Sequence, residues 1–95
     1  MNIRFYHDPN TDQPHIENHA VHEHEVEEVL LKPGEDRPGF DSARVAIGQT
    51  RSGRYLKVIY VPDSQIDSVF VITAYDLNGK PLKAFKRRIQ RRSRL

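Results

Sequence analysis

The histidines are the side chains at the start of this chain with the greatest chemical potential. All five lie within the first 24 residues, at His7, His15, His19, His22 and His24. On a helix, His15 and His19 share one face because they are four residues apart. Such a pair could bind zinc or nickel through its imidazole nitrogens, but the sequence offers no convincing third ligand. We therefore predict no metal site and interpret these histidines as mostly exposed, with any one able to act as a general acid or base.

Other catalytic patterns are missing from the sequence. The chain has no cysteine, which excludes disulfides, thiolate metal sites and cysteine nucleophiles. Neither Gly-x-x-x-x-Gly-Lys nor Gly-x-Gly-x-x-Gly occurs, and the serines have no recognisable nucleophile context. The sequence therefore predicts no nucleotide or other cofactor.

Cleavage of RNA is a reaction that needs neither a metal nor a cofactor. The 2′-hydroxyl can attack the adjacent phosphorus if the protein supplies a base, cations for the developing charge and an acid for the leaving 5′-oxygen. Histidine, tyrosine, lysine and arginine can supply all of these, and arginine binds phosphate oxygens in a bidentate manner. All four residue types are present, although many basic α+β domains share this inventory.

Charge is distributed unevenly along the 95 residues. Residues 1–78 contain seven Lys or Arg and all thirteen acidic residues, a net charge of −6, whereas residues 79–95 contain eight Lys or Arg and no acid, a net charge of +8. A basic block of this kind indicates binding to nucleic acid or to an acidic protein, and the alternative is a solvated tail. The residues predicted to bind RNA phosphates here are Lys83, Lys86, Arg87, Arg88 and Arg91.

The first half of the chain predicts a strand and two helices. Residues 3–7 are typical of a short strand, and Pro14 favours a short helix over residues 15–19. Val26, Val29 and Leu30 form the apolar stripe of a helix over residues 22–32, which Pro33-Gly34 ends. Residues 35–42 contain Pro38-Gly39 and indicate a loop or an edge strand.

The second half predicts a sheet and a final helix. Strands are expected over residues 44–50, 54–61 and 68–76, and their short connections favour an antiparallel meander. Leu82, Phe85 and Ile89 form the stripe of a basic helix that begins at Pro81. The expected fold is a single α+β domain over residues 1–95, with two N-terminal helices on a small antiparallel sheet of three to five strands and frayed residues 92–95.

Alternation along the strands predicts which side chains share a face. One predicted set is apolar and is assigned to the core beneath the N-terminal helices: Val45, Ile47, Leu56, Val58, Tyr60, Phe70, Ile72 and Ala74. The other set contains Arg44, Lys57 and Tyr75, which we expect to gather on a half-open face beside the basic helix. There they could hold phosphates and stack a base, and the alternative is an ordinary solvent face with extended Lys and Arg side chains.

The order of these elements, together with several short segments, resembles the BrnT-like toxins of bacterial toxin–antitoxin modules and a related small bacterial domain. The family has a Lys-His-Gly-Val-like segment before an acidic helix, and His19-Ala20-Val21 precedes the acidic residues 23–28 here. The family's Ala-Ile-Gly strand end and Gly-Arg turn match Ala46-Ile47-Gly48 and Gly53-Arg54. Its last strand commonly reads Ile-Ser-Ala-Arg, where this chain has Ile72-Thr73-Ala74-Tyr75.

The resemblance implies a RelE/ParE-like fold and a ribonuclease that arrests growth until an antitoxin encoded by an adjacent gene binds it and forms a hetero-oligomer with it. Residue by residue, it carries over His19, Arg44 and Arg54 as catalytic residues, with Tyr75 at the position of the family's arginine. Two departures are Ala20 for the family's glycine and Tyr75 itself, which could stack on a base or act as an acid. The final helix matches the family only in being basic.

The leading functional hypothesis is therefore a type II toxin that cleaves RNA without a metal, through His19, Arg44, Arg54 and Tyr75, with Lys57 and the basic helix binding RNA. The alternative is a domain without catalytic activity that binds RNA, DNA or an acidic protein through the same helix. The longest apolar runs are four residues, so no membrane-spanning helix is predicted. The first residues contain no apolar run typical of a secretory signal, and a cytoplasmic location is expected.

Overall fold

The computed structural model describes residues 1–65 and 67–93, which form an α+β domain around one five-stranded mixed sheet. The elements along the chain are β1 (Asn2–Phe5), the 3-10 helix η1 (His15–His19), α1 (Glu23–Leu31), β2 (Glu35–Pro38), β3 (Arg44–Gln49), β4 (Tyr55–Pro62), β5 (Ser68–Asp76) and α2 (Gly79–Ser93). Arg92 and Ser93, predicted to be frayed, lie within α2, and residues 94–95 lie outside the described residues. None of the helices described is long and apolar enough to cross a membrane.

The sheet has the strand order β1-β5-β4-β3-β2. The predicted antiparallel meander is confirmed for β3, β4 and β5, and β2 adds to it as an antiparallel edge strand. The expectation of a wholly antiparallel sheet is wrong, because β1 pairs with β5 in parallel. No tight hairpin joins these two strands, so turn geometry does not impose an antiparallel direction on them.

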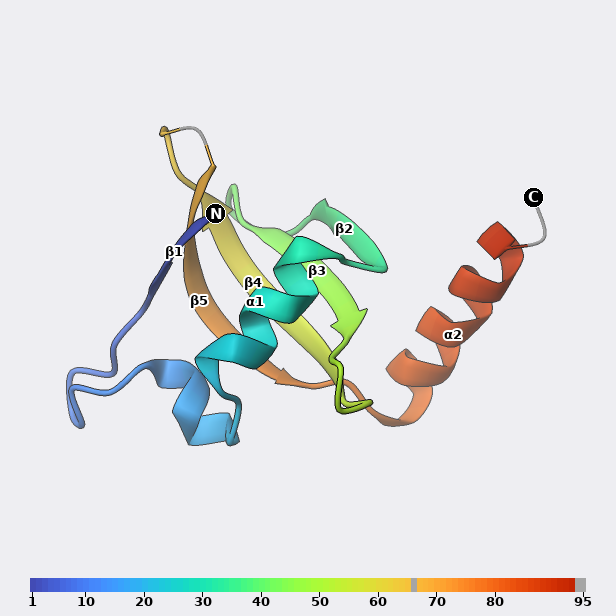
Figure 1. Ribbon diagram of the computed structural model, residues 1–95, viewed down its shortest axis with the longest axis horizontal. Helices are drawn as coiled ribbons and strands as arrows, with labels where there is room; N and C mark the ends of the chain where they lie inside the picture. Colours follow the sequence, from blue (N-terminus) through green and yellow to red (C-terminus); the bar gives the residue numbers. More distant parts are fainter. Residues whose placement is uncertain (66, 94–95) are drawn as a thin grey trace.

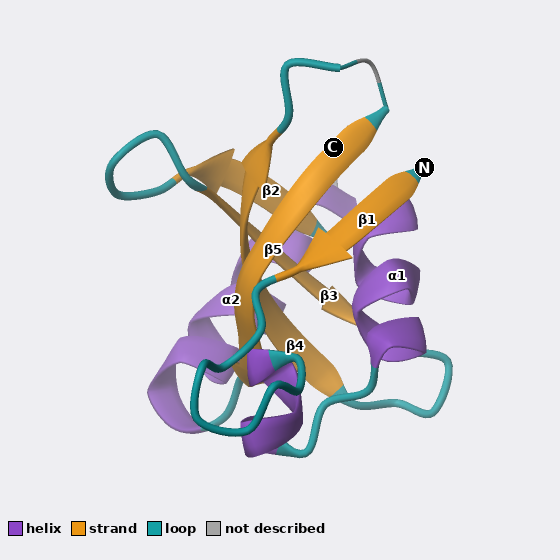
Figure 2. Cartoon of the chain, turned by 90° about the vertical axis from the view of Figure 1, so that its left-hand side faces the viewer, coloured by secondary structure: helices purple, strands orange, loops and turns teal. Residues whose placement is uncertain are grey.

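The two α-helices lie on opposite sides of the sheet, as Figures 1 and 2 show. Helix α1 buries Val26 and Val29 against one face, where residues from three strands complete the main core: Ala46, Leu56, Val58, Tyr60, Val71 and Ala74. Ile16 of η1 joins the same core. Helix α2 packs Phe85 against Ile47 and Leu77 in a smaller cluster on the other face.

The predicted core set is confirmed in β4 and at Ala74, but it is wrong for Phe70 and Ile72 of β5, and its residues in β3 face α2 rather than the N-terminal helices. Cross-strand pairing aligns Ala46 with Val58 and Val58 with Ala74, so Ala46 shares the face that α1 covers, while Val45 and Ile47 belong to the α2 cluster. In β5 a bulge pairs Tyr60 with Val71 instead of Ile72. The bulge changes the alternation of faces, so the main core takes Val71 in place of Phe70 and Ile72.

A buried carboxylate anchors α2 to the sheet edge. Glu35 of β2 is 6% exposed and accepts a hydrogen bond from Arg88 Nη2 at 3.0 Å and one from Arg92 Nη2 at 3.2 Å. Its hydrogen bonds to Arg88, more than any other factor, lower the pKa of Glu35. Together with Phe85, this pairing fixes the position of α2 beside the open part of the sheet.

Candidate functional site

The face of the sheet opposite α1 carries a cluster of polar and aromatic side chains. Ile47, Lys57 and Tyr75 are successive partners across β3, β4 and β5, so they share the face on which Ile47 meets α2. Lys57 Nζ lies 5.9 Å from the centre of the Tyr75 ring, in the range of a cation–π contact. Lys57 and Tyr75 are only partly buried, so both remain accessible.

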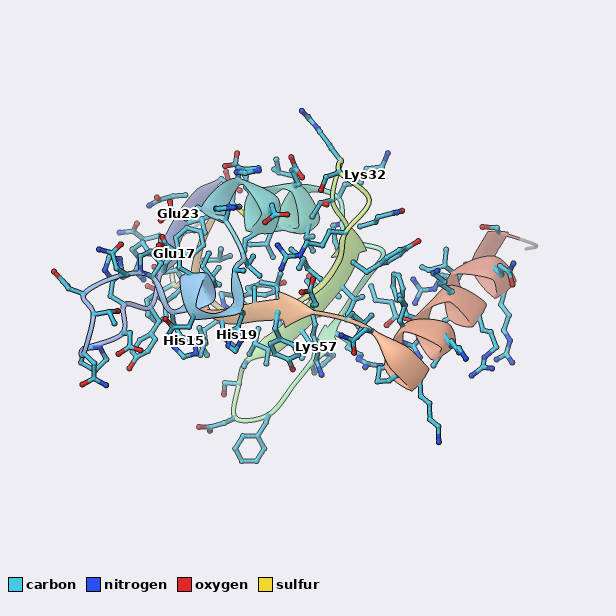
Figure 3. The ribbon with its side chains drawn as sticks, turned by 90° about the horizontal axis from the view of Figure 1, so that it is seen from below. His15, Glu17, His19, Glu23, Lys32 and Lys57 are labelled. Atoms are coloured by element: carbon cyan, nitrogen blue, oxygen red, sulfur yellow. The ribbon has the colours of Figure 1, made fainter. Side chains whose placement is uncertain are left out.

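Two histidines of η1 extend this cluster. The rings of His19 and Tyr75 are 5.9 Å apart between centroids, and those of His15 and His19 are 5.3 Å apart. Figure 3 shows His15, His19 and Lys57 along the same side of the molecule. We call these four side chains, His15, His19, Lys57 and Tyr75, the His–Tyr cluster.

An aspartate stands behind His15. Asp8 Oδ2 lies 4.0 Å from His15 Nδ1, close enough for an ion pair when the imidazole is protonated. The Asn10 backbone N–H donates to Asp8 at 2.9 Å and the Asn18 amide donates to it at 3.0 Å. These two bonds, the first above all, lower the pKa of the Asp8 carboxyl. The result is a fixed negative charge beside one imidazole of the cluster.

The local geometry of η1 explains where His19 points. Pro14 precedes this single turn, and Ala20 ends it in the left-handed conformation with φ 56°. Arg54 then holds the end of the turn, because Nη1 donates to the Ala20 carbonyl at 2.7 Å and Nη2 donates to the His19 carbonyl at 3.3 Å. His19 is thereby held beside Tyr75.

Arg54 is fully occupied by this structural role. Besides the two carbonyls, it donates to Asp76 at 2.5 and 3.0 Å and to the buried Glu25 at 3.0 Å. Its hydrogen bonds with Asp76 raise the pKa of Arg54 and lower that of Asp76. Arg54 was predicted to be catalytic. In the structure its guanidinium binds the backbone that carries His19, so it positions this histidine.

Arg44 lies away from the cluster. Its pairing with Tyr60 puts it on the α1 side of the sheet, where Nε donates to Asp36 at 2.9 Å. Asp36 also accepts the Tyr60 hydroxyl at 2.5 Å, and burial together with this bond raises the pKa of Tyr60 to about 12. The expected gathering of Arg44 with Lys57 and Tyr75 is therefore not seen, because the register of β3 turns Arg44 to the opposite face.

The basic residues predicted on the last helix fall into two groups. Arg88 is bound to Glu35, and Lys86 Nζ lies 5.0 Å from the centre of the Tyr55 ring. Lys83, Arg87 and Arg91 are exposed and form no ion pair within the described residues. They follow each other at i, i+4 and i+8, so they make one row along the helix.

The cluster can transfer protons and hold an anion. It brings together two imidazoles, a phenol and an ammonium group. The three residues predicted for the site come from three elements: His19 from η1, Lys57 from β4 and Tyr75 from β5. Sequence reasoning did not assign His15 or Asp8 to this site, although the spacing of His15 and His19 indicated a shared face. Across residues 1–65 and 67–93, no three His, Asp or Glu side chains are arranged to hold a metal ion.

Comparisons of the chain with protein-family models, with curated proteins and with solved structures found no match.

Proposed function

We propose that this protein is a metal-independent endoribonuclease whose active centre is the His–Tyr cluster. The observation that carries the proposal is that the His19 ring lies 5.3 Å from the His15 ring and 5.9 Å from the Tyr75 ring, with Lys57 Nζ 5.9 Å from the centre of the tyrosine ring. These groups provide a base, an acid and a cation on one accessible surface, which are the requirements for cleavage by the 2′-hydroxyl.

Each side chain has a defined role in the proposed reaction. His19 takes the proton of the 2′-hydroxyl, whose oxygen forms a bond to the adjacent phosphorus. The bond from phosphorus to the 5′-oxygen breaks, and protonated His15, paired with Asp8, donates its proton to that oxygen. Lys57 stabilises the negative charge on the phosphorane oxygens. The products are a 2′,3′-cyclic phosphate and a 5′-hydroxyl, and proton exchange with water restores both imidazoles.

Tyr75 binds the substrate base in this proposal. Its ring is near both His19 and Lys57 and is partly exposed, and aromatic stacking is the usual way in which proteins bind single-stranded RNA. The exposed row of Lys83, Arg87 and Arg91 on α2 supplies phosphate contacts further along the chain of nucleotides. Arg54 acts by holding His19, and Arg44 stabilises the β2–β3 pair.

The biological role that we propose is that of a type II toxin acting on cytoplasmic RNA. The resemblance to BrnT-like toxins and their RelE/ParE-like fold supports this role through the order of the elements and the segments around His19, Ala46 and Arg54. The proposed antitoxin is encoded by an adjacent gene and stabilises the toxin by binding its folded state.

A second candidate is a nucleic-acid-binding domain without catalytic activity. The observation in its favour is that both arginines expected to stabilise the transition state are paired with carboxylates, Arg44 with Asp36 and Arg54 with Asp76. In that case the exposed cations of α2 would still bind RNA. The logarithm of the binding constant would fall by roughly 0.7 for each phosphate contacted when the salt concentration rises tenfold.

A cleavage assay separates the two candidates. Purified protein is incubated with a single-stranded RNA and with the same RNA whose 2′-hydroxyls are methylated, both with a chelator present. We expect cyclic-phosphate products from the first RNA only. His19→Gln should reduce the rate by about a hundredfold or more, whereas His24→Gln, which changes an exposed histidine of α1 outside the cluster, should leave it unchanged.

Expression in a bacterium tests the proposed role. We expect growth arrest and new RNA ends within minutes, and neither with His19→Gln at the same protein level. Cleavage in vitro without growth arrest would retain the ribonuclease and overturn the toxin. Salt-dependent RNA binding without cleavage would overturn the ribonuclease in favour of the binding domain.

A further inference from the structure

A groove separates α2 from the turns at one end of the sheet. Its volume is about 780 Å³, and it is distinct in its lining residues from the His–Tyr cluster. Lys86, Arg87 and Gln90 contribute from α2, and Lys32 and Gln49 contribute from the segments facing it. Figure 1 shows α2 standing to one side of the sheet, with the end of β3 next to it.

The floor of the groove is apolar. It is formed by Tyr55, Phe85 and Ile89, and the backbone of Gly34 lies against the Phe85 ring. A Cβ atom on Gly34 would come within 2.7 Å of Phe85 Cζ, so the glycine lets the ring sit close to the turn. Phe85 is 4% exposed, whereas Tyr55 and Ile89 are only partly buried and offer apolar surface to a ligand.

The rim of the groove is positively charged. Lys32, Lys86 and Arg87 line it, and no carboxylate is among the lining residues. Glu35 is the only acid of the described chain that forms ion pairs with α2, and it contacts Arg88 and Arg92. The cations at the rim therefore have no acidic partner within residues 1–65 and 67–93.

We propose that this groove binds an acidic amphipathic segment of a partner protein. Aliphatic side chains on one face of the segment would cover Tyr55 and Ile89, while its carboxylates pair with Lys86, Arg87 and Lys32. A second copy could offer its acidic α1 to these cations, but the apolar stripe of that helix, Val26 and Val29, is buried in its own core and cannot cover the floor of the groove. RNA would satisfy the cations, but Phe85 is only 4% exposed and Lys86 Nζ already lies 5.0 Å from the centre of the Tyr55 ring, so the floor offers little aromatic face on which a base could stack. The proposal does not depend on the ribonuclease activity.

The test uses a synthetic helical peptide with leucine on one face and glutamate on the other, bound to the full chain. A scrambled peptide of the same composition measures attraction by charge alone. We expect binding of the amphipathic peptide in fluorescence anisotropy, with an affinity at least about tenfold above that of the scrambled peptide. Binding should also shift the amide signals of Gln49 and Gln90 in NMR spectra.

Matched variants locate the binding site. Gln90→Glu adds a negative charge to the groove with almost no change in side-chain size. This charge repels the glutamates of the peptide, so the variant should bind it about fivefold more weakly. Gln13→Glu makes the same change in the loop before η1 and should have no such effect. Arg87→Gln at the rim should weaken binding more than Arg91→Gln, which removes the same charge from the same helix outside the groove lining. A His19→Gln protein should bind the peptide normally whether or not it cleaves RNA.

Three results would overturn the proposal. Equal binding of the two peptides would show that only charge matters. A dimer in sedimentation experiments that dissociates in Gln90→Glu would assign the groove to a second copy. A single-stranded RNA whose affinity falls in Gln90→Glu, while that of the peptide is unchanged, would assign the groove to nucleic acid.

Discussion

The two faces of the sheet differ in what their side chains do: one face forms the main core, and the other carries the accessible polar side chains of the candidate site. On the α1 face, aliphatic side chains are almost completely buried, and the charged residues there, Arg44 and Arg54, are bound to carboxylates. On the opposite face, α2 covers only one end, and Lys57, Tyr75 and the histidines of η1 remain accessible. An arginine or lysine of this domain is therefore available to a ligand where, among the described residues, the fold places no carboxylate beside it, as at Lys57 and in the exposed row on α2.

The largest loss of stability should come from replacing Arg54, which is bound both to Glu25 of α1 and to the end of η1 that carries His19. Arg54→Gln leaves Glu25 buried without its cationic partner and releases the carbonyls of His19 and Ala20. We expect a loss of about 3 kcal/mol in the free energy of unfolding, measured by urea denaturation, because an isolated buried charge is costly. A loss below about 1 kcal/mol would mean that Arg54 does not fix η1. Arg51→Gln, at an exposed arginine without an ion pair in the described residues, is the control.

The same substitution on the two faces of β4 should differ in cost. Val58 is fully buried under α1, whereas Val61, paired with Phe70, lies on the open face and is partly exposed. We expect Val58→Ala to lower the free energy of unfolding by about 2 kcal/mol and Val61→Ala by less than about 1 kcal/mol. Thermal denaturation of both variants would test this, and equal losses would contradict the assignment of the faces.

The anchor of α2 should make part of the stability depend on acidity. The folded-state pKa of Glu35 is below its ordinary value of 4.5, so its stabilising effect is complete above that pH and is lost as the pH falls through the folded value. At neutral pH, Glu35→Gln should lower the free energy of unfolding by roughly 1–2 kcal/mol. The difference from the wild type should shrink as the pH falls below 4.5 and Glu35 becomes protonated. Faster amide exchange in α2 of the variant would show that the loss arises at this helix, and a difference constant with pH would contradict the pairing.

The smallest effect on stability is expected at Tyr75. Its side chain has no hydrogen bond within residues 1–65 and 67–93 and is partly exposed, so Tyr75→Phe should leave the Tm within about 2 °C of the wild type. If the ring stacks on a base, RNA affinity should persist in Tyr75→Phe and fall in Tyr75→Ala by about 1–3 kcal/mol. A large drop in Tm in Tyr75→Phe would instead make this tyrosine part of the core.

Local patterns predicted the order of the elements, although β1 ends at Phe5 rather than at residue 7 and α2 begins at Gly79 rather than at Pro81. The stripe of Val26 and Val29 predicts α1, and the breaks at Pro33-Gly34 and at 51–53 mark its end and the β3–β4 turn. The face of each strand was harder to predict, because it depends on pairing. The bulge opposite Ile59 and Tyr60 has no obvious signature in the sequence, and it moves Val71 into the core.

The candidate site was predicted only in part, for a similar reason. His19, Lys57 and Tyr75 come together as a surface, but nothing in the sequence shows that Arg54 is bound by Asp76, which is 22 residues away, and by the carbonyl of Ala20, which is 34 residues away. Such contacts form only after the strands are paired. Arg44 was expected at the site from the strand pattern and the family resemblance, and Arg54 from the resemblance alone, whereas both arginines are paired with carboxylates of the chain itself.

The left-handed residue at the end of η1 also has an evolutionary meaning. Ala20 adopts φ 56°, a conformation that costs an alanine about 1 kcal/mol and costs a glycine almost nothing. An alanine codon becomes a glycine codon through a single nucleotide change. Mutation can therefore adjust the rigidity of the loop that carries His19 in one step, while every side chain of the His–Tyr cluster is inherited unchanged.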